Sequence, residues 1–252
     1  MASKQIEFNP EEKIFLGELA LDGALRKIKG TLSLAIAAKE NGFKEIILPE
    51  ENALEASLVS GIKIYGAKNL SQILKHLRGE EEIPLAPKVE IEHDFAYPYD
   101  FGEIKGQELS KRGLSLAAAG GHHVLMVGPP GTGKTMLARA LPSILPAMDF
   151  DEILDVTKIH SVSGNLKKSY LAERPFRNPH HTASYVALVG GGQSPRPGEI
   201  TLAHRGVLFL DEFPEFERRV MESLRQPLED KMVTVSRARA TLNFPAQIMM
   251  IL

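Results

Sequence analysis

A glycine-rich run of eight residues limits the possible folds of this chain more than any other stretch. It reads Gly128-Pro129-Pro130-Gly131-Thr132-Gly133-Lys134-Thr135 and matches the phosphate-loop pattern G-x-x-x-x-G-K-[ST] at every fixed position. A short apolar run, residues 124–127, precedes it, and residues 136–141, rich in helix formers, follow it. Because the pattern requires a strand, a glycine loop and a helix in this order, we expect an α/β fold with a parallel sheet.

The residue types in this loop suit a phosphate ligand. Gly131 and Gly133 have no Cβ, so the backbone can curl tightly and point its N–H groups inward as an anion-binding nest. The helix that begins near Lys134 adds the positive end of its dipole. Lys134 is predicted to reach the β- and γ-phosphates, and the Thr135 hydroxyl to bind Mg²⁺. We therefore predict that residues 128–135 bind ATP and Mg²⁺.

An acidic pair follows a second apolar run. Residues 207–210 are typical of a buried strand and lead directly into Asp211-Glu212. In an open parallel sheet, ligands bind beyond the carboxyl ends of the strands, where the phosphate loop is also expected. We predict that Asp211 binds the Mg²⁺ and that Glu212 orients or deprotonates the attacking water. Lys134 and Glu212 are thus the predicted catalytic residues.

Composition restricts the class of protein. The 252 residues correspond to one or two domains, and 43% hydrophobic with 25% charged residues is ordinary for a globular protein. A net charge of -2 argues against a strongly basic nucleic-acid binder but allows a local basic stripe. The chain has no cysteine, so it has no disulfide framework. Without a membrane-length apolar run or a signal-peptide core, a cytoplasmic location without a membrane partner is expected.

Residues 1–79 are predicted to form a small α/β unit. The expected strands lie at 15–21, before an Asp22-Gly23 turn, and at 45–48 and 62–65. The expected helices are one at 31–41 that ends at Gly42 and one capped by Asn52 that runs through 59. A third helix has an apolar stripe at Leu70, Ile73, Leu74 and Leu77. Residues 80–98, with three acidic residues in a row and several prolines, resemble an interdomain linker.

Residues 99–252 are predicted to form the nucleotide domain. The expected helices are one that ends at Gly120-Gly121, one after the phosphate loop that is closed by Pro146, one capped by Asp149 through about 159, and one at 216–226 ended by Pro227. Residues 161–203 are expected to be long and irregular, and such a segment is usually functional. Residues 231–244 indicate a hairpin, and residues 248–252 a buried strand. The chain ends in that strand, so we expect a truncated domain.

Several stretches in this region resemble an AAA+ ATPase of the magnesium-chelatase-like group, close to the ComM/YifB family. They are DFGEIKGQ (100–107), AAAGGHHVLMVGPPGTGKTMLARALPSILP (117–146), RPFRNPHHTAS (174–184), PRPGEITLAHRGVLFLDE (195–212) and ESLRQPLED (222–230). The resemblance implies that Ile104 and Gly106 lie near the adenine. It also implies that residues 161–203, and the hairpin around Arg237, face the pore of a homo-oligomeric ring, a hexamer in this family.

Residues 17–79 resemble the second half of the Lon-protease-like domain that precedes the ATPase in that family. The resemblance rests on GELALDG (17–23) and IILPEENALEA (46–56). It places Leu32 where a Lon-type protease has its catalytic lysine, and a leucine cannot accept a proton. We therefore expect a partial domain without proteolytic activity.

The resemblance favours an ATP-driven motor that acts on DNA, of the branch-migration type used in recombination of imported DNA. Six basic residues in the expected pore loops are compatible with phosphate contacts or with solvated loop charge: Lys167, Lys168, Arg174, Arg177, Arg237 and Arg239. A chelatase-type ATPase that remodels a metal-inserting enzyme is the alternative, and a nucleotide-binding assembly module without turnover is another. The lid and the arginine finger of the family lie beyond residue 252, so this chain is expected to bind ATP but to hydrolyse it slowly.

Two histidine pairs, His122-His123 and His180-His181, leave three interpretations open. Adjacent residues point in different directions, so one pair does not readily bind one ion. Zinc would also need a further ligand, and neither pair has a carboxylate at a helical i+4 position. The alternatives are a metal site, a hydrogen-bonded structural role and, for His180-His181, contact with nucleic acid.

Overall fold

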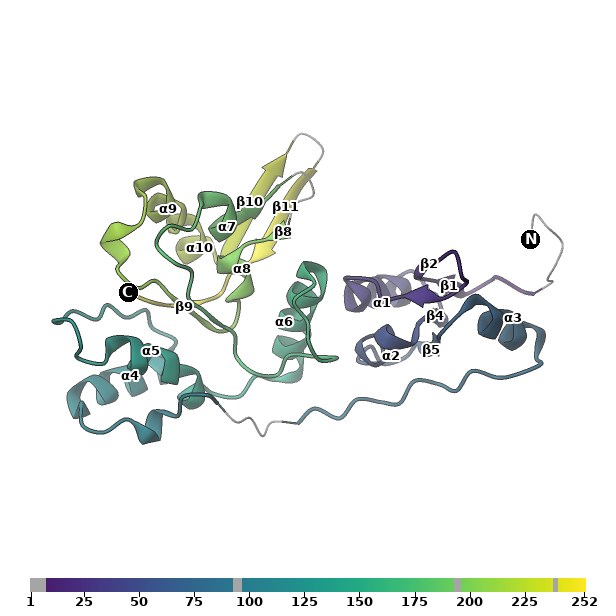
Figure 1. Cartoon of the computed structure of the whole chain (residues 1–252), viewed down its shortest axis with the longest axis horizontal. Coiled ribbons are helices and arrows are strands. Elements are labelled where there is room, and N and C mark those ends of the chain that lie inside the picture. Colours follow the sequence, from purple (N-terminus) through teal and green to yellow (C-terminus); the bar gives the residue numbers. More distant parts are fainter. Residues whose placement is uncertain (1–7, 93–96, 193–195, 238–239) are drawn as a thin grey trace. The chain divides into compact units, whose positions relative to one another are not determined.

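The computed structural model describes residues 8–92, 97–192, 196–237 and 240–252. The chain divides into two compact units, whose elements are labelled in Figure 1. The first unit contains the chain up to Ile91 together with His160–Tyr170, and the second contains Glu92–Ile159 and Leu171–Leu252. The sequence pattern gave no indication that residues 160–170 belong with the first unit.

A three-stranded parallel sheet in the order β1-β4-β5 forms the centre of the first unit. Its strands are β1 (Lys13–Phe15), β4 (Glu45–Pro49) and β5 (Lys63–Ala67). Ile46, Ile47 and Leu48 of β4 are almost fully buried, because β4 is the central strand. The expected strand at 15–21 is divided between β1 and a short antiparallel pair, β2 (Glu18–Leu19) with β3 (Leu25–Arg26), which encloses the predicted Asp22-Gly23 turn.

Three helices accompany this sheet, α1 (Thr31–Glu40), α2 (Glu50–Ala56) and α3 (Leu70–Arg78). Gly42 has a φ of 84° just beyond α1, as the predicted C-terminal cap requires. The prediction for Asn52 is wrong. The helix starts at Glu50, and the buried Asn52 amide instead accepts from the Ile28 N–H and donates to the Ile28 carbonyl, both at 3.0 Å.

The first part of the segment predicted as a linker packs on this unit. Ile83 is 3% exposed and lies in an apolar cluster with Ile47 and Ile73, and Leu85 forms an isolated bridge with Tyr65 of β5. An apolar residue within the acidic stretch therefore attaches the chain to the sheet edge.

The second unit is built on a parallel sheet in the order β12-β9-β6. The strands are β6 (Phe176–Arg177), β9 (Val207–Phe209) and β12 (Met249–Ile251). The apolar run before the phosphate loop lies next to β12: Val124 bridges Ile251, and the Met126 N–H donates to the Leu252 carbonyl at 2.8 Å. The predicted strand at 248–252 is confirmed, and the carboxyl ends of all these segments meet at one edge.

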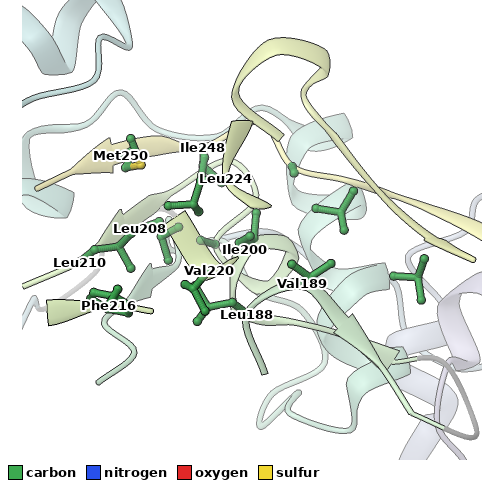
Figure 2. Close-up of a cluster of buried hydrophobic side chains, with 14 residues drawn as sticks. Leu188, Val189, Ile200, Leu208, Leu210, Phe216, Val220, Leu224, Ile248 and Met250 are labelled. Atoms are coloured by element: carbon green, nitrogen blue, oxygen red, sulfur yellow. The ribbon is translucent and has the colours of Figure 1, made fainter. Parts of the chain in front are cut away.

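Alternating residues of β9, together with Leu210 directly after it, are buried on the two faces of this sheet. Leu208 and Leu210 face a cluster with Leu188, Ile200 and Val220, shown in Figure 2. Val207 and Phe209 face the opposite cluster, which includes Leu114 and Leu137. The first cluster contains residues of α7 (Tyr185–Val189), α8 (Glu199–Leu202) and α9 (Arg218–Ser223), and the second contains residues of α4 (Glu108–Gly120) and α5 (Lys134–Ala140). A fully buried central strand thus explains the continuous apolar run at 207–210.

Several predicted helix ends are displaced. The helix after the phosphate loop does not continue to Pro146, because α5 passes at Ala140 into a 3₁₀ turn, η2 (Leu141–Ile144), that contains Pro142. Asp149 caps α6 (Phe150–Ser163) by accepting from the Glu152 N–H at 2.8 Å, as predicted, but the helix is longer than expected. The predicted helix at 216–226 is also wrong in its bounds: α9 is followed by α10 (Arg225–Asp230), and Pro227 lies within the first turn of α10, where no intrahelical N–H bond is lost.

The remaining elements are short. They are η1 (Phe101–Glu103), β7 (Gly190–Gly191), β8 (Arg196–Pro197), η3 (Phe213–Glu215) and the antiparallel hairpin of β10 (Met232–Arg237) with β11 (Ala240–Pro245). The predicted hairpin is therefore confirmed, and the segment at 161–203 contains the end of α6, followed by β6, α7, β7, β8 and α8. Within the described ranges, no helix is both long and apolar enough to cross a bilayer.

Candidate active site

The phosphate loop connects the Val124 segment with α5 at the carboxyl edge of the second sheet. Gly131 and Gly133 have φ angles of 77° and 85°, in the left-handed region where a Cβ would be strained. Gly133 directly precedes the first residue of α5, so the unpaired N–H groups of the first helical turn face the loop. This part of the chain has the backbone form that an anion-binding nest requires.

The side chains of the loop are ordered by contacts within it. The Lys134 ammonium donates to the carbonyl oxygens of Gly128 at 2.7 Å and Pro129 at 3.0 Å. The Thr132 hydroxyl donates to the Pro129 carbonyl at 2.9 Å. The cation of the motif therefore lies against the loop backbone, within reach of an anion that the loop would bind.

The structure brings Thr135 and Asp211 together from distant parts of the chain. The Thr135 hydroxyl donates to Asp211 Oδ2 at 3.0 Å, and Asp211 Oδ1 accepts from the Glu212 N–H at 3.1 Å. A hydroxyl and a carboxylate are the hard oxygen ligands that Mg²⁺ prefers. The donor set expected for the metal is thus assembled at one point, between the start of α5 and the end of β9.

Glu212 has an unusual backbone conformation. Its φ of 53° and ψ of 43° place a non-glycine residue in the left-handed region, which is uncommon and is often found at functional sites. Its side chain is 67% exposed, and Oε2 lies 3.4 Å from Nδ1 of His181. The carboxylate therefore projects from the carboxyl edge of β9 and has a histidine beside it.

Residues 104–107, which the family resemblance places near the adenine, contact the phosphate loop. Gly106 and Gln107 both have positive φ angles, 68° and 59°, just before α4. The Gln107 side-chain amide donates to the Thr132 carbonyl at 3.0 Å, which joins residues 104–107 to the phosphate loop. Gln107 was not among the predicted site residues, although it is the last residue of the DFGEIKGQ stretch. Ile104 packs against the core cluster that contains Leu114 and Leu137.

The histidine pairs have different surroundings. His123 Nδ1 accepts from the Met250 N–H at 3.0 Å, and burial lowers the pKa of this imidazole. His123 is therefore a neutral structural link to β12. The rings of His180 and His181 lie 4.1 Å apart, and His181 contacts Glu212. Among the described residues, no group of three potential ligands is arranged to hold a metal through these pairs.

Two of the six basic residues that were considered for phosphate contacts form bonds within the protein. Arg174 donates to the carbonyls of Pro146 and Arg205 and pairs with Glu152 at 3.2 Å. Arg177 forms a two-bond pair with Glu199, at 2.5 and 2.7 Å.

The structure describes the side chains of two of the other four basic residues, Lys167 and Lys168. Lys167 and Lys168 are exposed. The Arg237 side chain and all of Arg239 lie outside the described residues. The possible phosphate contacts of the two lysines therefore remain a prediction, and those of Arg174 and Arg177 would compete with the contacts that these arginines make inside the protein.

Comparison with known proteins identifies the relatives of this chain. The family described as "Magnesium chelatase, subunit ChlI" matches residues 100–252, more than half of the chain, and a second description, "Subunit ChlI of Mg-chelatase", matches residues 1–52. Competence protein ComM of Haemophilus influenzae is 46% identical over 94% of this chain, and YifB of Escherichia coli is 44% identical over 99%. Lon protease 2 of Bacillus subtilis is 29% identical over 68% of the chain.

The chain spans about half the length of its ComM and YifB relatives, 47% and 49%. Among solved structures, a complex between subunits BchI and BchD of magnesium chelatase matches with a TM-score of 0.48 and 24% identity, over 62% of this chain and 54% of that one. The sequence relationships and the parallel sheet topology confirm the predicted α/β fold of the AAA+ class.

Proposed function

Because the chain belongs to the magnesium-chelatase-like family that includes ComM and YifB, we propose that it binds MgATP and hydrolyses it as part of a motor acting on DNA. The observation that carries this proposal is the 3.0 Å bond between Thr135 and Asp211, next to a loop with Lys134 folded onto it. A chance glycine-rich turn would not place a hydroxyl and a carboxylate together in this way.

Each residue has a defined task in this proposal. The N–H groups of residues 131–135 and the Lys134 ammonium bind the phosphates, and Thr135 and Asp211 hold the metal. A bound Mg²⁺ ion would neutralise negative charge that develops on the phosphates. Glu212, exposed beyond β9, orients or deprotonates the attacking water. Residues 104–107 form one side of the adenine site.

The DNA part of the proposal rests on relatives rather than on the site. The Haemophilus influenzae relative is named a competence protein. It is 46% identical to this chain over 94% of this chain's length, which is 47% of the relative's own length. The chelatase-type alternative has support in the family description of residues 100–252. Both alternatives imply a ring of identical chains, which we include in the proposal.

Stimulation by DNA separates the two alternatives. ATP hydrolysis by the purified chain is measured with no polymer, with single-stranded DNA and with heparin, which has a similar charge density. A motor on DNA should be stimulated by DNA and not by heparin. A rate that DNA leaves unchanged, from a chain that does hydrolyse ATP, would contradict the DNA function and favour the chelatase type.

A further inference from the structure

His181 lies beside the proposed catalytic carboxylate, in a way that the sequence did not indicate. Its Nδ1 is 3.4 Å from Glu212 Oε2, and the His181 side chain is 31% exposed. Within the described part of the chain, the His181 ring is the one basic side chain within 4.0 Å of the Glu212 carboxylate. Since Oε2 faces the imidazole, Oε1 is the oxygen left to accept a proton or a hydrogen bond from water.

Sheet topology explains how two residues so far apart in sequence meet. His181 follows β6, and Glu212 follows β9, which are neighbouring parallel strands with Phe176 opposite Val207. The carboxyl ends of such strands lie at the same edge of the sheet. The two side chains therefore meet because of strand order, which no local sequence motif encodes.

The loop that carries His181 is held by short-range contacts. The Ala183 N–H donates to the His180 carbonyl at 2.8 Å, and the Thr182 N–H donates to His180 Nδ1 at 3.3 Å. The His180 ring packs against the His181 ring. The Ser184 hydroxyl then caps α7 by accepting from the Ala187 N–H at 3.2 Å. These hydrogen bonds order the loop backbone on both sides of His181, and the His180 ring packs beside the His181 imidazole.

We propose that His181 is a positioning residue for Glu212, which holds one carboxylate oxygen so that the other faces the attacking water. This inference rests on the proposed ATP hydrolysis and extends it to a residue outside the phosphate loop and the acidic pair. Glu212 needs such a partner because its side chain is largely exposed and has several rotamers available. Holding a reacting group in one geometry increases the rate without strengthening substrate binding.

The same contact connects hydrolysis to the segment between β6 and β9. The loop at 180–184 leads into α7, whose Leu188 and Val189 are buried in the core cluster of Figure 2. A displacement of α7 would therefore move the imidazole away from Glu212. The His181 imidazole is therefore the group through which the segment between β6 and β9 contacts the Glu212 carboxylate.

The test compares single-turnover hydrolysis of MgATP, with the chain in excess over nucleotide, and the Kd of a fluorescent ATP analogue. The variants are His181→Ala, His181→Gln, Glu212→Gln and the double variant His181→Ala/Glu212→Gln. His122→Ala serves as the matched control, because it removes an exposed imidazole from the other histidine pair.

We expect His181→Ala to reduce the hydrolysis rate about tenfold, since a misplaced catalytic group can cost up to about 10²-fold. The Kd should stay unchanged. His181→Gln, which retains an N–H donor, should recover most of the rate, and His181→Ala should have no further effect when Glu212 is already glutamine.

Other outcomes would overturn the inference. A rate for His181→Ala equal to or above that of the wild type, a loss of nucleotide binding, or additive effects in the double variant would each do so. A wild-type chain that binds but does not hydrolyse ATP would instead overturn the proposed hydrolysis, and this inference with it. The two failures are thereby distinguishable.

Discussion

At the scale of single residues, the site depends on two carboxylates that stand next to each other in sequence and face different neighbours. Asp211 accepts from Thr135 at the start of α5, whereas Glu212 turns away in a left-handed conformation and meets His181. The change of backbone conformation at Glu212 is what separates the two side chains. In the proposed site, Asp211 would hold the metal and Glu212 would face the attacking water.

Substitution should separate these roles. Asp211→Asn removes one negative charge from the proposed metal site, so the Mg²⁺ concentration required for half-maximal ATP binding should rise. Glu212→Gln leaves the phosphate loop intact, so ATP should bind with the parent Kd while hydrolysis is lost. Titrations with Mg²⁺ and ATP, followed by a phosphate-release assay, measure both effects. Hydrolysis by Glu212→Gln at the parent rate would assign the catalytic role to another carboxylate.

A buried histidine should make the second unit sensitive to acid. His204 is 4% exposed, its Nδ1 accepts from the Gln247 N–H at 3.0 Å, and Nε2 is buried with no partner among the described residues. Burial, with Arg205 nearby, lowers the pKa of His204 from 6.5 to about 4. The unfolded chain therefore binds the proton more readily, and stability that is complete above pH 6.5 is lost as the pH falls towards 4.

This loss should be on the order of 2 kcal/mol at pH 5, according to the linkage between proton binding and folding. His204→Asn keeps an acceptor for the Gln247 N–H and has no proton to gain. Urea unfolding at pH 7.5 and pH 5 should therefore show a smaller decrease in stability for His204→Asn than for the wild type. Equal decreases in the two proteins would show that another group is responsible.

The sequence could predict the phosphate loop because all its requirements are local: glycines for backbone curvature, a lysine and a hydroxyl in one run. It could also predict that Asp211 and Glu212 lie near this loop, since they directly follow an apolar strand. Gln107 and His181 were not predicted as site residues, because their contacts depend on how α4 and β6 pack against the loop and β9. Residues brought to a site by tertiary structure leave no periodic signal.

At the scale of helices and strands, most elements were predictable and their ends were not. The continuous apolar run at 207–210 indicated a strand buried on both faces, and β9 is one. Pro227 was expected to end a helix, but it lies in the first turn of α10, where proline is tolerated. Asn52 was expected to be a cap, yet its buried amide is used by Ile28. A tertiary contact thus outweighed the local capping preference of Asn52, whereas Pro227 marks the start of a second helix and not the end of the first.

Arg174 should act as a structural clamp between elements. Its guanidinium is held by two carbonyls and Glu152, with a side-chain exposure of 15%. Arg174→Ala should lower the free energy of unfolding by about 2 kcal/mol, less than the ~3–5 kcal/mol for breaking a buried pair, because Glu152 retains Arg205. Lys168→Ala, at an exposed position, is the control and should leave stability unchanged. Unchanged stability of Arg174→Ala combined with weaker DNA binding would restore the DNA-contact prediction.

At the scale of the whole molecule, family membership was predictable from the sequence. The grouping of residues 160–170 with the first unit was not. Ser161 shows why: its hydroxyl donates to Glu55 of α2, a buried carboxylate that also accepts from the Leu32 N–H. These contacts join segments that are far apart in sequence. The boundaries at 79 and 98, and the assignment of a Lon-like domain, remain predictions about domain organisation.

The first unit should have no peptidase activity. Leu32 stands where the Lon resemblance places a lysine, and it is 0% exposed at the start of α1. No amine is therefore available at this position to accept a proton from a nucleophile. Incubation with unfolded casein and MgATP should yield no fragments, with a Lon protease as the positive control. Cleavage that disappears after a substitution within residues 8–79 would contradict this expectation.

The central claim is that residues 128–135 bind ATP, and the most direct measurement is the Kd for ATP of the wild-type chain and of Lys134→Ala, by calorimetry with Mg²⁺ present. Lys88→Ala, an exposed lysine of the first unit, controls for the loss of one positive charge. The account predicts that Lys134→Ala binds at least about 100-fold more weakly, which corresponds to about 3 kcal/mol, and that Lys88→Ala binds like the wild type. An unchanged Kd in a folded Lys134→Ala protein would contradict the assignment of this loop as the nucleotide site.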